Sequence, residues 1–121
     1  MDISSICSPA IAEKLKSLGF PLKESDYCWV NGVLEKRDWT MDDCIPAYTD
    51  EEIFDDSPDW IDYPGTRYEL ELEQTPYMDW KAYFSDGTYI LNNHFEIAVS
   101  SVDARAKILI YIIEQELFGY D

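Results

Sequence analysis

The chain has 121 residues, of which 25 are acidic and 9 basic, so its formal net charge at pH 7 is −16. A chain of this length is typical of one domain and buries about two-thirds of its unfolded surface. The charge argues against direct binding to nucleic acid or to anionic membranes, because both interactions depend on Lys and Arg meeting phosphate groups. We therefore expect a single domain over residues 1–121 that binds neither.

The cysteines and the N-terminus indicate a cellular compartment. Cys7, Cys28 and Cys44 are odd in number and far apart, without the paired spacing of a zinc site or a redox dithiol. Reduced thiols in a cytosol are the simplest interpretation. The first ten residues, MDISSICSPA, have no basic region before an apolar run, so they do not read as a signal peptide. The expected location is cytoplasmic.

The first element in the chain is predicted to be a short helix. Ser8 is a good N-cap, Pro9 suits the first helical position, and Gly19 followed by Phe20 is typical of a helix end. The apolar face of this helix comprises Ile11, Leu15 and Leu18.

A β-hairpin is predicted next, over residues 27–36. Asn31-Gly32 separates two short apolar runs, and these two residues readily take the positive φ angles of a tight type I′ turn.

Residues 38–62 form an acidic stretch, with ten Asp and Glu residues and no Lys or Arg. Thr49 and Glu52 have the spacing of a capping box, which predicts a short helix from Asp50 to Asp56. Pro58 prevents the helix from continuing.

After Pro64-Gly65 the apolar period changes to two, which predicts an antiparallel meander of three or four strands. Tyr68, Leu70 and Leu72 alternate with Glu69, Glu71 and Glu73. Trp80, Ala82 and Phe84 alternate in the next strand. Turns at Asp86-Gly87 and Asn92-Asn93 predict further strands over residues 88–91 and 95–99.

The last helix, predicted from Ser101 to Phe118, is the element that can bury most apolar surface. Ser100 and Asp103 fit a capping box, and Gly119 is a suitable stop. The run from Ile108 to Ile113 leaves no polar face, which favours a helix against a sheet on one side and covered in part on the other. A strand is the rival interpretation for an Ile-rich run. The predicted fold class is α+β, with this helix packed across the meander.

The layout also resembles a known group of proteins. Its parts are AEKLKSLGF, PAYTDEEIFDDSPDWI, a YELEL strand with a following Trp and Tyr strand, and VDARAKILIYIIE. This arrangement is similar to that of short, uncharacterised proteins encoded among phage and mobile-element genes of bacteria. The resemblance implies an accessory protein of unknown role and transfers no functional residue.

None of the residue patterns indicates catalysis or a cofactor. His94 is the only histidine, and none of the cysteines lies in a motif typical of a nucleophile activated by histidine. The carboxylates are too numerous for one pair to stand out as a glycosidase acid and base. The calcium-loop pattern is missing, and each of the five glycines is solitary. We expect no enzyme activity, no catalytic residue, no cofactor and no metal.

Two functions from different classes remain. The first is a protein-interaction module, in which some aromatic residues anchor a partner and an acidic rim selects a basic one. The candidate aromatics are Trp39, Tyr48, Phe54, Trp60, Tyr63 and Tyr77. The second is a nucleic-acid mimic, in which rows of carboxylates occupy the basic groove of a nuclease or defence enzyme. A plain solvated acidic surface would look the same in sequence.

The expected partner is an unidentified protein, and the acidic rim favours a basic one. The predicted partner-binding residues are Asp55, Asp56, Asp59, Trp60, Asp62, Glu69, Glu71 and Glu73.

Overall fold

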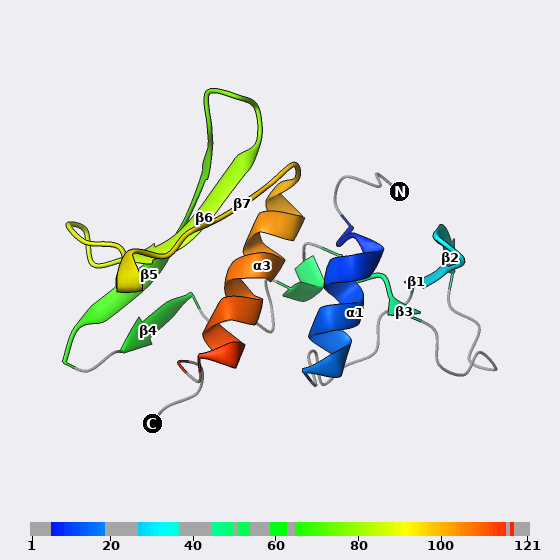
Figure 1. The fold of residues 1–121 in the computed structure, drawn as a ribbon, viewed down its shortest axis with the longest axis horizontal. Helices are drawn as coiled ribbons and strands as arrows, with labels where there is room; N and C mark the ends of the chain where they lie inside the picture. Colours follow the sequence, from blue (N-terminus) through cyan, green and yellow to red (C-terminus); the bar gives the residue numbers. More distant parts are fainter. Residues whose placement is uncertain are drawn as a thin grey trace.

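A computed structural model describes residues 6–18, 27–36, 45–49, 51–53, 59–62, 65–115 and 117. In chain order the elements are helix α1 (Pro9–Ser17), strands β1 (Tyr27–Val30), β2 (Val33–Lys36), β3 (Ile45–Pro46), β4 (Trp60–Asp62), β5 (Arg67–Gln74) and β6 (Trp80–Ser85), the 3-10 helix η2 (Leu91–Asn93), strand β7 (Glu96–Ala98) and helix α3 (Ser101–Glu114). The predicted α+β class is confirmed. Helices α1 and α3 lie side by side in the middle of the molecule, with one sheet on either side of the pair (Figure 1).

Helix α1 forms where the sequence predicts it. Ser8 is its N-cap and Pro9 its first residue, while Ala12 and Leu15 are fully buried on its inner face. The Ser8 side chain makes no capping hydrogen bond, so the start of the helix is stabilised by other groups.

The smaller sheet has the strand order β2-β1-β3, and all its pairs are antiparallel. The predicted hairpin is confirmed: Asn31 and Gly32 both have positive φ, at 52° and 79°, as a type I′ turn requires. Strand β3 was not predicted, because two residues are too few to show an alternating pattern. It forms because residues 45–46 pair with Cys28 and Trp29 in a distant part of the chain.

The larger sheet has the order β4-β5-β6-β7, again antiparallel throughout. The predicted alternation of strand β5 is confirmed, with Tyr68, Leu70 and Leu72 packed against the core and the three intervening Glu side chains exposed.

The predicted strand over residues 88–91 is wrong. Only an isolated bridge joins Ser85 to Ile90, and Leu91 begins helix η2. The Asp86 carboxylate accepts hydrogen bonds from the backbone N–H groups of Thr88 and Tyr89, at 2.8 and 2.7 Å. These two groups are then engaged in a local turn, which competes with a ladder for the same donors.

Helix α3 is buried on several sides, which explains its apolar run. Val102, Ala106 and Leu109 belong to the core shared with α1 and the smaller sheet. Ala104, Ile108 and Ile112 of the same helix belong to the core under the larger sheet. The helix therefore packs across the meander on one side and against α1 on the other.

The end of helix α3 differs from the prediction. The helix stops at Glu114 rather than at Phe118. After it, the N–H of Leu117 donates to Ile112 O, five residues earlier, at 2.9 Å. Leu117 is buried in the core under the larger sheet. The chain thus leaves the α-helical hydrogen-bond pattern after Glu114, and Leu117 packs into this core. Phe118 and Gly119 lie outside the described residues.

In the part of the chain that the structure describes, none of the helices has both the length and the apolar character that crossing a membrane requires.

Candidate protein-interaction surface

The face of the larger sheet that points away from α3 gathers most of the predicted binding residues. The strand register aligns Trp60 of β4 with Glu69 of β5, and Glu71 and Glu73 of β5 with Tyr83 and Lys81 of β6. We call this surface the outer sheet face, and its residues are Trp60, Asp62, Arg67, Glu69, Glu71, Glu73, Lys81, Tyr83, Phe95 and Ile97. Sheet formation thus brings residues from four strands onto one surface.

Carboxylates outnumber cations on the outer sheet face. The carboxylates are those of Asp62, Glu69, Glu71 and Glu73, and all four side chains are exposed. The two cations, Arg67 and Lys81, each lie over aromatic rings of the same face. The Arg67 guanidinium carbon is 4.0 Å from the Trp60 ring centroid, and Lys81 Nζ is 4.5 Å from that of Phe95. Such contacts contribute about 0.5–1 kcal/mol each at exposed sites.

The negative potential of the face acts on Tyr83. Its pKa is raised from the usual value near 10, first because partial burial disfavours the phenolate and then because Glu73 and Glu71 repel a second negative charge. The same negative potential attracts an approaching cation. The face is therefore suited electrostatically to basic groups.

Five of the eight predicted binding residues lie together on this face: Trp60, Asp62, Glu69, Glu71 and Glu73. Trp60 is 45% exposed, so its ring is available to a partner. Asp59 does not join them. It precedes strand β4, and its Oδ1 accepts a 3.4 Å hydrogen bond from the buried Arg105 of α3, on the other side of the sheet. Asp55 and Asp56 lie outside the described residues.

Two apolar residues, one on strand β7 and one just before it, complete the surface, and the sequence did not assign them to it. Phe95 and Ile97 are exposed on the outer sheet face, whereas Ala98 packs against the core. An alternating strand shows which residues share a face but not which face is buried. In strand β7, Glu96 and Ala98 lie on the side that faces the core. The Glu96 carboxylate accepts a hydrogen bond from His94 Nε2.

The aromatic candidates divide between core and surface. Tyr48 is buried in the core shared by α1 and the smaller sheet, so it is no anchor. Trp60 and Tyr77 are exposed. Trp39, Phe54 and Tyr63 lie outside the described residues.

The sites considered for nucleophilic chemistry are engaged in structural contacts. His94 stacks on Tyr111 of α3 with ring centroids 3.6 Å apart and also contacts Glu96. Cys7 and Cys28 are buried in the core. Burial, followed by the charge of Asp103 and a hydrogen bond to it, raises the pKa of the Cys7 thiol far above its ordinary value. A thiol in this state stays protonated and is a poor nucleophile. Cys44 lies outside the described residues.

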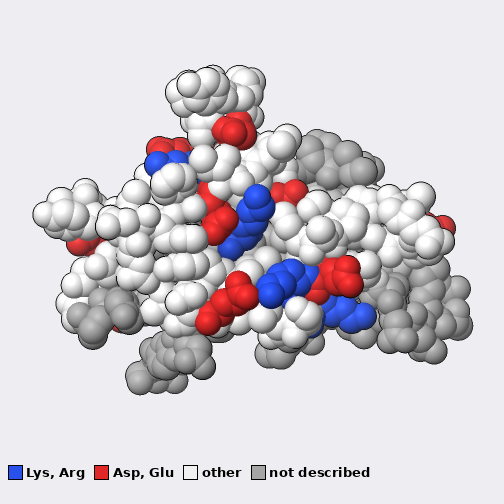
Figure 2. All heavy atoms as spheres, in the orientation of Figure 1, with Lys and Arg blue, Asp and Glu red and all other residues white. Residues whose placement is uncertain are grey.

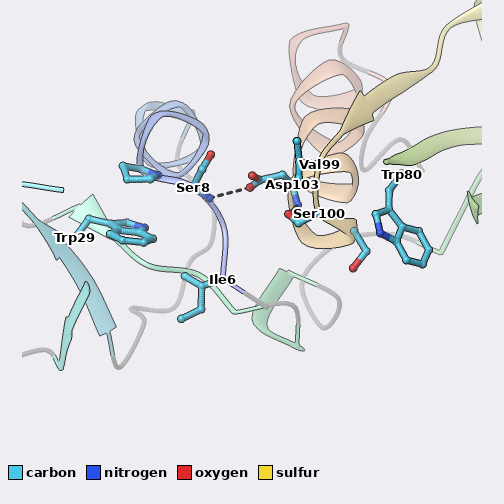
Figure 3. A pocket seen from close by; sticks show the side chains of 9 residues that line it. Ile6, Ser8, Trp29, Trp80, Val99, Ser100 and Asp103 are labelled. Carbon is cyan, nitrogen blue, oxygen red and sulfur yellow. Dashed lines mark hydrogen bonds between the residues drawn. The ribbon is translucent and has the colours of Figure 1, made fainter. Parts of the chain in front are cut away.

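A hollow of about 520 Å³ lies where the N-termini of α1 and α3 meet (Figure 3). Trp29 and Ile6 line one side, Trp80 and Val99 line the other, and Asp103 points from α3 toward Ser8 between them. Asp103 and Ser100 are engaged in hydrogen bonds within the fold. Asp103 Oδ1 accepts from Ser8 N–H at 2.8 Å, and the Ser100 hydroxyl accepts from Asp103 N–H at 3.2 Å.

Acidic and basic side chains lie next to one another over the helices in the view of Figure 2. One such pair is exposed, with Lys14 Nζ of α1 lying 3.1 Å from Glu114 Oε2 of α3. The described residues include no group of three His, Cys, Asp or Glu side chains arranged to hold a metal ion.

Comparison of the chain with protein-family models, with curated proteins and with solved structures gave no match. We therefore argue its function from the chemistry of the described residues.

Proposed function

We propose that the chain is a small, acidic, non-catalytic protein that binds a basic partner protein through the outer sheet face. The observation that carries this proposal is the juxtaposition, on one exposed surface, of a carboxylate row with accessible apolar rings. Interfaces take much of their energy from a few aromatic or apolar anchors, while surrounding charges select the partner and steer its approach. Trp60, Phe95 and Ile97 supply the anchors, and the three Glu residues of β5 supply the charge.

The contacts of the protein's own cations support this proposal. Arg67 lies over Trp60 and Lys81 over Phe95, and the strand register sets Arg67 opposite Asp62 and Lys81 opposite Glu73. A Lys or Arg of a partner that displaced either of them would meet the same ring and the same negative field. We place this binding in the cytoplasm, and the layout resemblance supports an accessory role in a phage or mobile element.

Mimicry of nucleic acid is the second candidate, and one observation favours it. Glu69, Glu71 and Glu73 project from one strand on one side, and alternate residues of a strand lie about 6.6 to 7 Å apart. The apolar rings and the two cations of the same face favour the first proposal, since a mimic is served best by unbroken negative charge. The two candidates differ in the dependence of binding on salt and in competition with DNA or RNA.

The test compares two variants with the same change in charge. One carries Glu69→Gln, Glu71→Gln and Glu73→Gln on the outer sheet face. The control carries Glu13→Gln, Glu35→Gln and Glu51→Gln, at exposed positions on other elements. A partner captured from extract of the cells that make the protein is identified and purified, and its Kd is measured for both variants and for Trp60→Ala.

We expect the outer-face variant and Trp60→Ala to bind at least about tenfold more weakly, while the control binds as the unchanged protein does. Equal losses in the two triple variants would show that only total charge matters and would end the proposal. Displacement by DNA, with binding that falls steeply as salt rises, would replace it by mimicry.

A further inference from the structure

The turn between β5 and β6, residues 75–79, stands clear of the rest of the molecule (Figure 1). We call it the hairpin tip. Tyr77 is 89% exposed and Met78 is 72% exposed, so two large apolar side chains project into solvent. In Figure 2 the tip is a lobe of uncharged residues above an acidic one. Single exposed apolar residues are common, but two adjacent ones at the end of a projecting hairpin are a candidate contact.

The backbone of the hairpin tip is unusual at Met78, whose φ is 72°. Residues with a Cβ rarely adopt this conformation, and Gly or Asn normally occupies it. The chain follows that rule elsewhere, because the other non-glycine residues with positive φ in the described part are Asn31, Asn92 and Asn93. Methionine therefore stands where the local backbone favours a different residue. A local preference overridden in this way points to a role for the side chain itself.

Hydrogen bonds hold the tip in this shape. Thr75 N–H donates to Asp79 O at 2.8 Å, and Met78 N–H donates to Thr75 O at 3.1 Å. The Thr75 hydroxyl accepts from Tyr77 N–H at 3.2 Å and donates to the Asp79 carboxylate. The loop is thus ordered before any contact is made, so binding through it loses little conformational entropy.

We propose that the hairpin tip is a preformed anchor that inserts Tyr77 and Met78 into an apolar pocket of a partner protein with a basic rim. Tyrosine offers large contact area with few rotatable bonds, and methionine adapts to irregular pockets. Glu73 and Asp79 flank the two side chains, which accounts for the sign of the rim. The net charge of −16 opposes contact with a second copy of the chain or with an anionic membrane. The anchor residues Tyr77 and Met78 lie outside the outer sheet face, and the flanking Glu73 is common to the two surfaces.

The first experiment places a photo-crosslinking amino acid at position 77 of the full chain, in the cells that make it. The control carries the same group at Val33, an apolar residue that is 60% exposed on the other sheet. We expect one discrete protein adduct from position 77 that is missing from position 33, with the crosslinked residue lying in an apolar pocket of the adduct. No adduct, equal adducts at both positions, a lipid adduct or an adduct with a second copy would each overturn the proposal.

The second experiment measures the Kd of that purified protein for Tyr77→Ala, Met78→Asn and the control Val33→Ala. Asn suits the positive φ, as at Asn31, so Met78→Asn should raise the melting temperature or leave it unchanged. We expect Tyr77→Ala and Met78→Asn to bind about tenfold or more weakly, and Val33→Ala to bind normally. Unchanged affinity in Met78→Asn, or a lower melting temperature, would overturn the proposal. Such a result does not bear on the outer sheet face, because neither Tyr77 nor Met78 belongs to that surface.

Discussion

The Asp103 carboxylate accepts a 2.8 Å hydrogen bond from the backbone N–H of Ser8, which lies 95 positions earlier in the chain. The bond ties the first turn of α3 to the N-cap of α1. Asp103 has the spacing of a capping box with Ser100, but only half of that box forms. The Ser100 hydroxyl accepts a hydrogen bond from Asp103 N–H. The Asp103 carboxylate does not bond Ser100 in return but accepts from Ser8 at the start of α1.

We expect Asp103→Ala to lower the free energy of unfolding by about 1.5–3 kcal/mol, because it removes a partly buried hydrogen bond to a charged acceptor. Urea denaturation at pH 7 measures the loss. The control is Glu114→Ala, which removes the exposed ion pair with Lys14 between the same two helices and should cost about 0–1 kcal/mol. Equal losses would mean that Asp103 has no special part in joining the helices.

The capping box at Thr49 and Glu52 is complete, and this permits a second test. Glu52 N–H donates to the Thr49 hydroxyl at 3.1 Å, and Thr49 N–H donates to the Glu52 carboxylate at 2.9 Å. Thr49→Ala should lower the free energy of unfolding by about 0.5–2 kcal/mol. Thr49→Ser should keep most of the stabilisation, because the serine hydroxyl can accept the same hydrogen bond. A serine variant as unstable as the alanine variant would show that packing of the threonine methyl group, and not the cap, is responsible.

Ile112 and Ile113 are neighbours on α3 with different surroundings. Ile112 is fully buried under the larger sheet, while Ile113 is only half-buried. Ile112→Ala should cost about 2–5 kcal/mol of unfolding free energy. Ile113→Ala should cost clearly less, because it leaves a smaller cavity. Denaturant unfolding of the two variants checks this order, and the reverse order would contradict the packing of α3.

The Cys7 thiol should make stability fall with rising pH. In the unfolded chain a thiol ionises near about pH 8.5. In the folded chain its pKa is raised, by burial first and then by Asp103, so the folded state keeps the proton when the unfolded state loses it. The contribution of the protonated Cys7 thiol to the free energy of unfolding is complete below about pH 8.5. Above this pH it is lost, by up to about 1.4 kcal/mol per pH unit.

Unfolding curves between about pH 7 and 9 measure this slope, before most of the tyrosine side chains, with an ordinary pKa of about 10, begin to titrate. Cys7→Ala serves as the reference, since it removes this thiol and leaves the other titrating groups in place. The difference between the two proteins should narrow as the pH rises. Parallel curves would show that Cys7 does not resist ionisation in the folded state.

Much of the secondary structure could be predicted because its causes lie within a few residues of each other. The hairpin at Asn31-Gly32 depends on the φ preferences of two residues, and the start of the short helix depends on Thr49 and Glu52. The period of two in strand β5 also placed Glu69, Glu71 and Glu73 on one face without any reference to the rest of the chain. These interactions are local, so sequence reasoning reached them.

The sequence by itself thus determined the α+β class, the Asn31-Gly32 turn, the Thr49–Glu52 capping box and the row of carboxylates. Tertiary structure decided the orientation of strand β7, the early end of α3 at Glu114, the turning of Asp59 toward Arg105 and the partner of the Asp103 carboxylate. It also made strands β3 and β4, which are too short to show a period. Each of these features depends on a contact between residues far apart in the chain. Local conformational preferences do not specify which distant residue becomes the contact partner.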